Sequence, residues 1–132
     1  MSKNQLSKIV LGTAQFNSGY GRFNKKHLNE NEILKLLNFC RANKISYLDT
    51  ANNYDQVFEK LDTKILSYFK IIYKFKPSLK KTYKSILKDL LLIKKNFNFN
   101  KIYCFILHNE NDLKKFKINY LASIQKLKKK KI

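Results

Sequence analysis

The sequence ISYLDT at residues 45–50 lies between two segments whose apolar residues recur at helical spacing, and this alternation decides the fold. Before it, four residues follow the i, i+3, i+4, i+7 pattern of a buried helix face: Ile33, Leu36, Leu37 and Cys40. After it, a second apolar stripe has a similar spacing: Val57, Leu61, Ile65 and Leu66. The short apolar run at 45–48 has the length of a strand. This part of the chain therefore predicts a helix, a strand and a further helix.

The same alternation continues in both directions. Apolar runs at 7–11, 69–75 and 102–107 indicate three more strands, and the nearly continuous run at 102–107 is typical of a strand buried on both faces. Two further amphipathic helices are predicted, one after Ser78 and one over 112–128. Strands that alternate with helices in units of about 30 residues imply right-handed crossovers and a parallel sheet. Since no linker interrupts the pattern, we expect an α/β fold of four βα units, one domain over 1–132.

The chain length limits how far this fold can close. A complete (β/α)₈ barrel needs about 250 residues, whereas this sequence has 132. Four parallel strands would form half of such a barrel, with two unpaired edges and an uncovered inner apolar face. We therefore expect a truncated or fragmentary protein that associates with itself or is poorly soluble. Two alternatives stay open: a separate chain supplies the C-terminal half, or two copies pair face to face.

The charge of the chain is strongly positive, with 28 Lys and Arg against 9 Asp and Glu and a formal net charge of +19. Only Arg22 and Arg41 are arginines, although nucleic-acid surfaces usually use arginine for bidentate contacts. The lysine excess therefore argues against a dedicated nucleic-acid surface, while a basic polyanion-binding module remains an alternative. Cys40 and Cys104 are far apart and fit buried thiols in a reducing cytoplasm. No apolar run has the length of a membrane span, so the expected location is cytoplasmic.

Polar residues follow the predicted strands where the active sites of parallel α/β folds form, at the strand carboxyl ends. They are Gly12 and Thr13 after the first strand, Asp49 and then Tyr54 after the second, Lys74 in the third and His108 after the fourth. A nearby ammonium lowers the pKa of a phenol, a carboxylate fixes that ammonium, and an imidazole can orient a carbonyl group. Such a set can protonate a carbonyl oxygen while a cofactor delivers hydride to its carbon.

These segments, in their order and spacing, resemble the aldo-keto reductase family. The likeness rests on 9–16, 47–54, 73–74 and 106–109, and the Asp-Thr-Ala-x-x-Tyr sequence at 49–54 is its most specific part. The resemblance implies a (β/α)₈ TIM barrel, NADP(H) as cofactor and interconversion of carbonyls and alcohols. It further implies the following roles: Tyr54 as proton donor, Lys74 lowering the pKa of Tyr54, Asp49 paired with Lys74, His108 orienting the substrate carbonyl, and Gly12, Thr13 and Asp49 binding the cofactor.

Two departures from the family pattern bear on activity. Asp55 follows Tyr54 where the family commonly has a small residue, and its negative charge would raise the pKa of the phenol. The family's fifth to eighth strands, which supply most cofactor contacts, have no counterpart in the sequence. We therefore expect an NADP(H)-dependent oxidoreductase acting on a small carbonyl substrate, with impaired or no activity as an isolated chain. A catalytically dead remnant is the other alternative to this enzyme.

Overall fold

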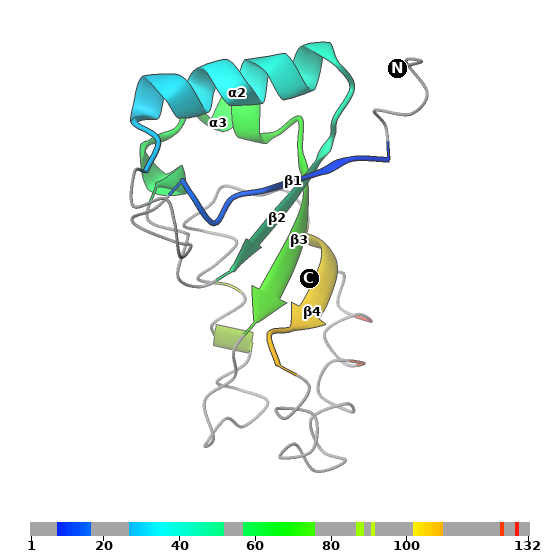
Figure 1. Ribbon diagram of the computed structural model, residues 1–132. Coiled ribbons are helices and arrows are strands. Elements are labelled where there is room, and N and C mark those ends of the chain that lie inside the picture. The colour runs from blue at the N-terminus through cyan, green and yellow to red at the C-terminus, as the bar shows by residue number, and fades with distance from the viewer. Residues whose placement is uncertain are drawn as a thin grey trace.

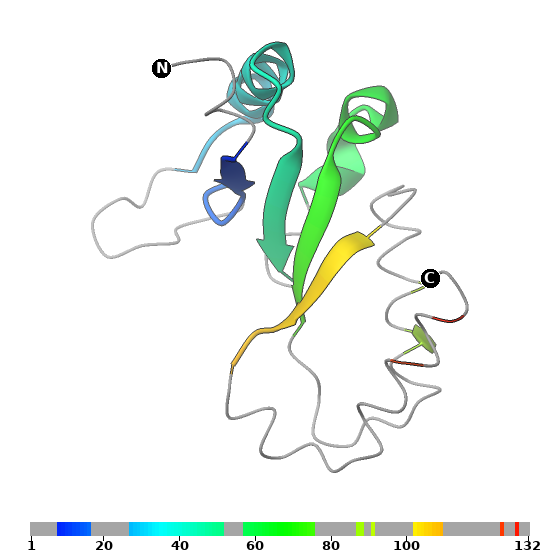
Figure 2. The ribbon, with the colours of Figure 1, turned by 90° about the vertical axis from the view of Figure 1, so that its right-hand side faces the viewer.

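The computed structural model describes residues 8–16, 27–51, 57–75 and 102–109, together with Leu87, Lys88, Leu91, Gln125 and Lys129. Four strands form one parallel sheet in the order β1-β2-β3-β4: β1 (Val10–Gly12), β2 (Tyr47–Ala51), β3 (Lys70–Phe75) and β4 (Ile102–Leu107). Figure 2 shows them side by side in this order. The predicted α/β class and parallel sheet are confirmed. Most of the helices predicted after Ser78 and over 112–128 lies outside the described residues.

Helix α2 (Glu30–Ala42) begins where its sequence provides a cap. The side chain of Asn29 accepts a hydrogen bond from the Glu32 amide at 3.0 Å, and the Glu32 carboxylate accepts one from the Asn29 amide at 2.8 Å. This reciprocal capping box satisfies two backbone donors at the helix start. The helix buries Ile33, Leu37 and Cys40, as its apolar spacing predicts. In Figure 1, α2 and the short α3 lie together on one side of the sheet.

The carboxyl end of α2 is closed by a left-handed turn. Asn43 caps the helix, and Lys44 has a φ of 61°, a conformation that L-residues rarely adopt. The amides of Lys44 and Ile45 donate to the carbonyls of Arg41 and Cys40 at 3.2 and 2.9 Å, which is the hydrogen-bond pattern of a Schellman motif. Ile45 then enters the core, so the turn leads the chain directly toward β2.

Replacing Lys44 with glycine is expected to stabilise the protein. Glycine has no Cβ to oppose a positive φ, so the free energy of unfolding should rise by about 1 kcal/mol. The matched control is Lys35→Gly at an exposed position inside α2, where the same replacement should lower it by about 1 kcal/mol. Urea denaturation of both variants measures the two changes. Equal effects of the two replacements would contradict the assignment of the turn.

The second predicted helix is interrupted. The structure has a 3₁₀ turn, η1 (Phe58–Lys60), followed by α3 (Thr63–Leu66), instead of one continuous helix from Val57. Leu61 is extended, and the Asp62 carboxylate accepts a hydrogen bond from the Lys64 amide at 2.8 Å, which starts a new helix. The apolar stripe is still buried because Leu61, Ile65 and Leu66 reach the core from both parts. Local capping by Asp62 therefore outweighs the continuous helical periodicity.

The core lies between the sheet and these helices. Alternate residues of the central strands point toward it, including Leu48 in β2 and Ile71, Tyr73 and Phe75 in β3, all of them fully buried. The register pairs Leu48 with Ile71, so their side chains lie on the same face. Residues from α2 and α3 pack against this face within one hydrophobic cluster. The other face of the sheet carries the intervening residues.

The prediction that the run 102–107 is buried on both faces is wrong. β4 is the last strand of the described sheet, and its Tyr103 and Ile106 side chains are 57% and 42% exposed. Cys104, expected to be buried, is only partly so. The register also shifts between Ile71 and Ile72 opposite β4. Among the described residues, β4 has a neighbouring strand on one side only. Its apolar sequence therefore predicted a strand correctly but overestimated how deeply that strand is buried.

These exposed residues belong to one side of the sheet, which we call the open face. The strand register places Val10, Tyr47, Ile72 and Ile106 among its apolar residues, and Tyr103 joins them because its ring contacts that of Tyr47. Val10 is 42% exposed. We expect the purified chain to associate through this face, because exposed apolar patches favour self-association. At low salt the net charge of +19 opposes this association, so sedimentation velocity should show larger species as salt is added.

The double variant Val10→Gln, Ile106→Gln tests the origin of this association. It removes two apolar side chains of the open face without changing charge, and should shift the sedimentation profile toward the monomer. The control is Phe39→Gln, since Phe39 is 60% exposed but lies on α2, away from the open face. A monomer at every salt concentration with a cooperative melt would contradict the expectation.

Candidate active site

An ion pair joins two neighbouring strands near their carboxyl ends. The Lys74 Nζ lies 2.8 Å from Oδ1 and 2.9 Å from Oδ2 of Asp49, so the ammonium contacts both carboxylate oxygens. The side chains of Lys74 and Asp49 are 30% and 33% exposed. Two charges that are partly withdrawn from water and contact each other directly are held in a fixed arrangement. The predicted pairing of Asp49 with Lys74 is therefore present in the structure.

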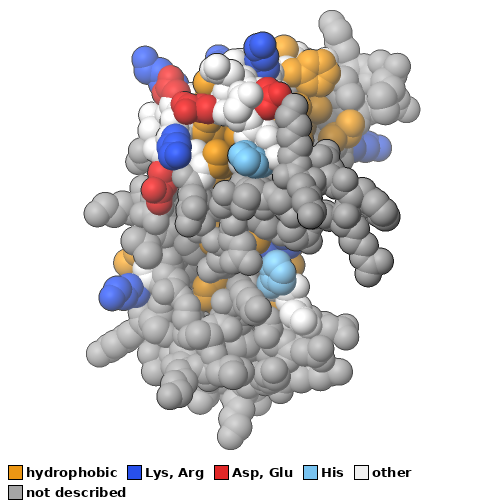
Figure 3. Space-filling view, turned by 60° about the vertical axis from the view of Figure 1, so that its left-hand side comes forward, with side chains coloured by type: hydrophobic (Ala, Val, Ile, Leu, Met, Phe, Trp, Pro, Cys, Tyr) orange, Lys and Arg blue, Asp and Glu red, His pale blue; other side chains and the backbone are white. Residues whose placement is uncertain are grey.

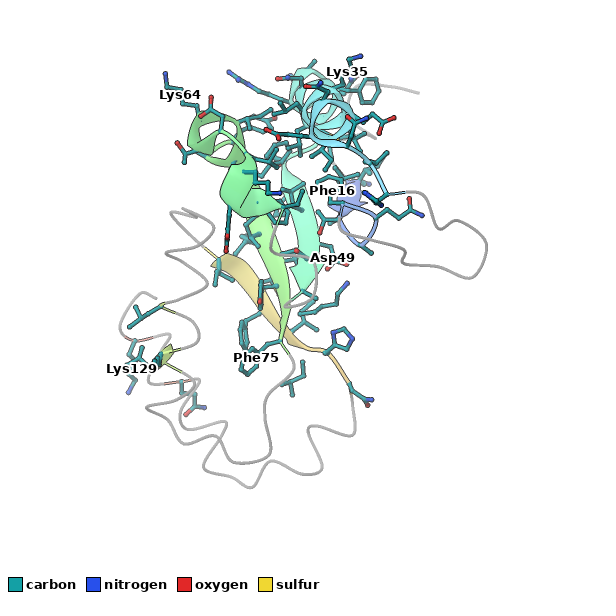
Figure 4. All side chains as sticks on the ribbon, turned by 90° about the vertical axis from the view of Figure 1, so that its left-hand side faces the viewer. Phe16, Lys35, Asp49, Lys64, Phe75 and Lys129 are labelled. Carbon is teal, nitrogen blue, oxygen red and sulfur yellow. The ribbon has the colours of Figure 1, made fainter. Side chains whose placement is uncertain are left out.

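Strand register brings these two residues together. β2 and β3 are parallel, and Lys74 pairs with Ala51, two residues beyond Asp49. Side chains two residues apart on a strand point to the same face, so Asp49, Ala51 and Lys74 share one side of the sheet. The long lysine side chain then reaches back to the carboxylate. Figure 4 shows Asp49 on β2, between Phe16 after β1 and Phe75 at the end of β3.

The segment after β1 is bound to the same aspartate. Both donors of Thr13, its amide and its hydroxyl, contact the carbonyl oxygen of Asp49 at 3.0 Å. Thr13 itself is fully buried. Gly12 pairs with Asp49 in the register, and a Cβ added to Gly12 would meet no atom of the described residues within 4 Å. The glycine therefore leaves open space beside the Asp49–Lys74 pair.

His108 directly follows β4, and its amide donates to the Phe75 carbonyl at 2.9 Å. This contact extends the β3–β4 pairing by one residue and places His108 at the carboxyl end of the sheet, with an exposed side chain. In Figure 1 the arrows of β2, β3 and β4 all point toward this end. Tyr54 lies in 52–56, outside the described residues. The structure thus brings Gly12, Thr13, Asp49 and Lys74 together, and the catalytic and cofactor-binding roles stay predictions.

A second side-chain cluster, which sequence reasoning missed, lies at the other end of the strands. The rings of Tyr47 and Tyr103 meet edge to face at a centroid distance of 5.0 Å, and Lys70 Nζ lies 5.3 and 5.6 Å from their centroids. A hydrogen bond with Tyr47 raises the pKa of the Tyr103 phenol above its ordinary value. Tyr47 and Lys70 are register partners, but Tyr103 joins them at the irregular part of β4. No sequence spacing signals that contact.

Other chemistry is limited in the part of the chain that the structure describes. Burial raises the pKa of the Cys40 thiol, which favours its neutral form. Among the described residues, no group of three or more metal-binding side chains occurs, and no helix is long and apolar enough to cross a membrane. Figure 3 shows acidic side chains interspersed with basic ones on the face it displays. The Asp49–Lys74 pair is therefore the strongest candidate for a functional site within this part of the chain.

Comparison with known proteins supports the fold. No family model matches the sequence, and no curated protein matches it. Solved structures do match, and two of them are described as a "putative aldo-keto reductase" from Pseudomonas aeruginosa. One has a TM-score of 0.71 and 18% identity over 95% of this chain, and the other has a TM-score of 0.70 and 19% identity over 94%. This chain spans only 53% and 54% of the respective structures. It therefore shares the α/β fold of about half of each of these structures.

Proposed function

We propose that this chain carries the catalytic end of an NADP(H)-dependent carbonyl reductase of the aldo-keto reductase type. The observation that supports the proposal best is the Asp49–Lys74 ion pair, with both oxygen contacts under 3 Å, beside the space that Gly12 leaves open. A lysine held by a carboxylate at the carboxyl end of a parallel sheet is suited to stabilise negative charge that develops on a neighbouring group. The structural neighbours have the same fold, which is consistent with this chemistry.

In the proposed reaction, a small aldehyde or ketone binds with its oxygen toward Tyr54. The phenol of Tyr54 donates its proton to the carbonyl oxygen as hydride reaches the carbonyl carbon, and the product is an alcohol. The Lys74 ammonium stabilises the phenolate that remains, and Asp49 holds that ammonium in place through contacts with both of its carboxylate oxygens. His108 donates a hydrogen bond to the carbonyl oxygen and orients it. A proton from solvent then restores the phenol.

The bound cofactor supplies the hydride. The described residues fit its nicotinamide end, because Gly12 presents no side chain and leaves open space next to the Asp49 carboxylate. The Asp49 carboxylate has lone pairs beyond its hydrogen bond with Lys74, and its Oδ1 is buried without a hydrogen-bond partner among the described residues. The proposal assigns no described residue to the phosphate groups. Because the chain spans about half of the matched structures, binding by the full chain is the first property to measure.

The test starts with binding and continues to turnover. NADPH is titrated into the full chain and followed by its fluorescence, and NADPH is then mixed with a small aldehyde while the alcohol is quantified. Binding together with slow alcohol formation is the result that the proposal predicts, since the chain spans about half of the matched structures and impaired activity is expected. Binding without alcohol would overturn the catalytic part of the proposal, and no binding would overturn all of it. Tyr54→Phe should keep NADPH binding and lose turnover, so an unchanged rate in this variant would exclude Tyr54 as the proton donor.

A further inference from the structure

Thr13 is a fully buried polar residue whose two hydrogen-bond donors contact a single atom. Its amide and its hydroxyl each lie 3.0 Å from the carbonyl oxygen of Asp49. A carbonyl oxygen has two lone pairs, so one residue occupies the full acceptor capacity of the Asp49 carbonyl. The β1–β2 ladder ends at the pairing of Gly12 with Asp49, and Thr13 extends the connection one residue further. The backbone from which the Asp49 side chain projects is thus held from the β1 side.

Thr13 is itself anchored to the core. Its carbonyl accepts a hydrogen bond from the Phe16 amide at 2.9 Å, which closes a tight turn after β1. The Phe16 side chain is buried, and its ring centroid lies 6.0 Å from that of Phe58. The turn is therefore fixed by packing at one end and by the Asp49 carbonyl at the other. Because Thr13 is fixed at both ends, its hydrogen bonds can hold the backbone of Asp49 in one position.

A neighbouring threonine shows that burial alone does not produce such a contact. Thr50 follows Asp49 in β2 and is as fully buried as Thr13, but its hydroxyl has no hydrogen-bond partner in the part of the chain described. The two residues therefore provide a matched comparison of buried hydroxyl groups, one bonded to Asp49 and one not. Removing the Thr13 hydroxyl leaves one lone pair of the Asp49 carbonyl without a donor. Removing the Thr50 hydroxyl breaks no hydrogen bond among the described residues.

We propose that Thr13 is a positioning residue: by binding the Asp49 carbonyl through both donors, it holds the Asp49 carboxylate against the Lys74 ammonium. Thr13 acts through Asp49 and not through contact of its hydroxyl with a cofactor. The relevance of this role to catalysis rests on the proposed function, whereas the geometric role can be measured without cofactor or substrate. Failure of one is therefore distinguishable from failure of the other.

The experiment follows the Lys74 ammonium by NMR of the full chain labelled with ¹⁵N-lysine. Lys74→Arg identifies the signal, since it removes only that resonance. In Thr13→Val, which replaces the hydroxyl with a methyl group of similar size, ammonium proton exchange should become about fivefold faster, the change in an equilibrium constant that one hydrogen bond typically supports. Thr13→Ser should restore the slow exchange, and Thr50→Val should keep it. An unchanged signal in Thr13→Val, or the same change in Thr50→Val, would overturn the proposal.

A measurement on the unmodified chain guards against a variant that does not fold. Scalar coupling across a hydrogen bond should connect the Thr13 amide nitrogen to the Asp49 carbonyl carbon, and the Thr13 hydroxyl proton should exchange slowly with solvent. Absence of both signals in the folded chain would overturn the proposal. If Thr13→Val does not fold, Thr13→Ala replaces it in the exchange experiment and is judged by the same outcomes.

Discussion

On the proposed function, replacing Lys74 with methionine is expected to lower the rate of NADPH-dependent aldehyde reduction by a factor of about 10² to 10³, the range for losing one charge-stabilising group in an active site. Methionine has a similar length but no charge, so the variant would lose the ammonium to which the proposal assigns stabilisation of the phenolate. The ion pair is about one-third exposed. Its loss should therefore change the free energy of unfolding by no more than ~1 kcal/mol. The rate of alcohol formation and the melting temperature, measured together, separate catalysis from stability.

Lys70→Met is the matched control for this prediction. Lys70 lies on β3 four residues before Lys74, on the same face of the sheet, but its ammonium lies over Tyr47 and Tyr103 at the other end of the strands. Both variants remove one positive charge from the same strand. A general electrostatic effect would lower the rate equally in both, whereas the proposed mechanism predicts a large loss only for Lys74→Met. Equal losses would therefore exclude a specific role for Lys74.

Replacing Phe58 with alanine is expected to reduce the free energy of unfolding by about 3 to 5 kcal/mol, the range for truncating a buried aromatic side chain. Phe58 is 1% exposed and its ring packs against that of Phe16. The truncation would leave a cavity where η1 meets the turn after β1, since the Phe58 ring contacts that of Phe16 there. Because a protein of this size has a small net stability, the variant should be largely unfolded at moderate urea concentrations.

Phe39→Ala provides the comparison for Phe58→Ala, because the same atoms are removed from an exposed site. Phe39 lies on α2 and is 60% exposed, so its replacement should change the free energy of unfolding by no more than about 0.5 kcal/mol. Urea denaturation followed by circular dichroism measures both variants. Similar midpoints for the two would show that the Phe16–Phe58 contact does not belong to a cooperative core.

The predicted elements differ in how well local patterns described them. Helix α2 follows its sequence closely, because Asn29 caps it, Asn43 ends it and the apolar stripe faces the sheet. The segment after Val57 differs from the single helix that its apolar spacing predicts, because Asp62 caps a new helix in the middle of that segment. Strand β4 was placed correctly by its apolar run, but its burial was not. The burial of a strand depends on the elements that pack against it, and the residues of the strand itself do not identify those elements.

The candidate site shows the same division. The position of His108 directly after β4 could be predicted, because the apolar run of that strand ends where polar residues begin. Gly12 and Asp49 were expected to follow their strands, but they lie within β1 and β2, because the pairing of the parallel sheet continues past the apolar residues. The hydrogen bond from the Thr13 hydroxyl to the Asp49 carbonyl could not be predicted, because a threonine after a strand is common and the two residues are 36 positions apart. The Tyr47, Lys70 and Tyr103 cluster depends on a register shift in β4. The pattern of apolar residues in β4 does not indicate where the register shifts, so the contact could not be predicted from the sequence.

The amino-acid sequence by itself determined the alternation of strands and helices, and with it the parallel sheet and the end of the sheet where polar residues gather. These features follow from local periodicity, chain connectivity and capping. Only the tertiary structure decided that Lys74 contacts both oxygens of Asp49 and that Thr13 holds the Asp49 carbonyl. The physical reason is strand register, since a shift by one residue would turn each of these side chains to the opposite face of the sheet.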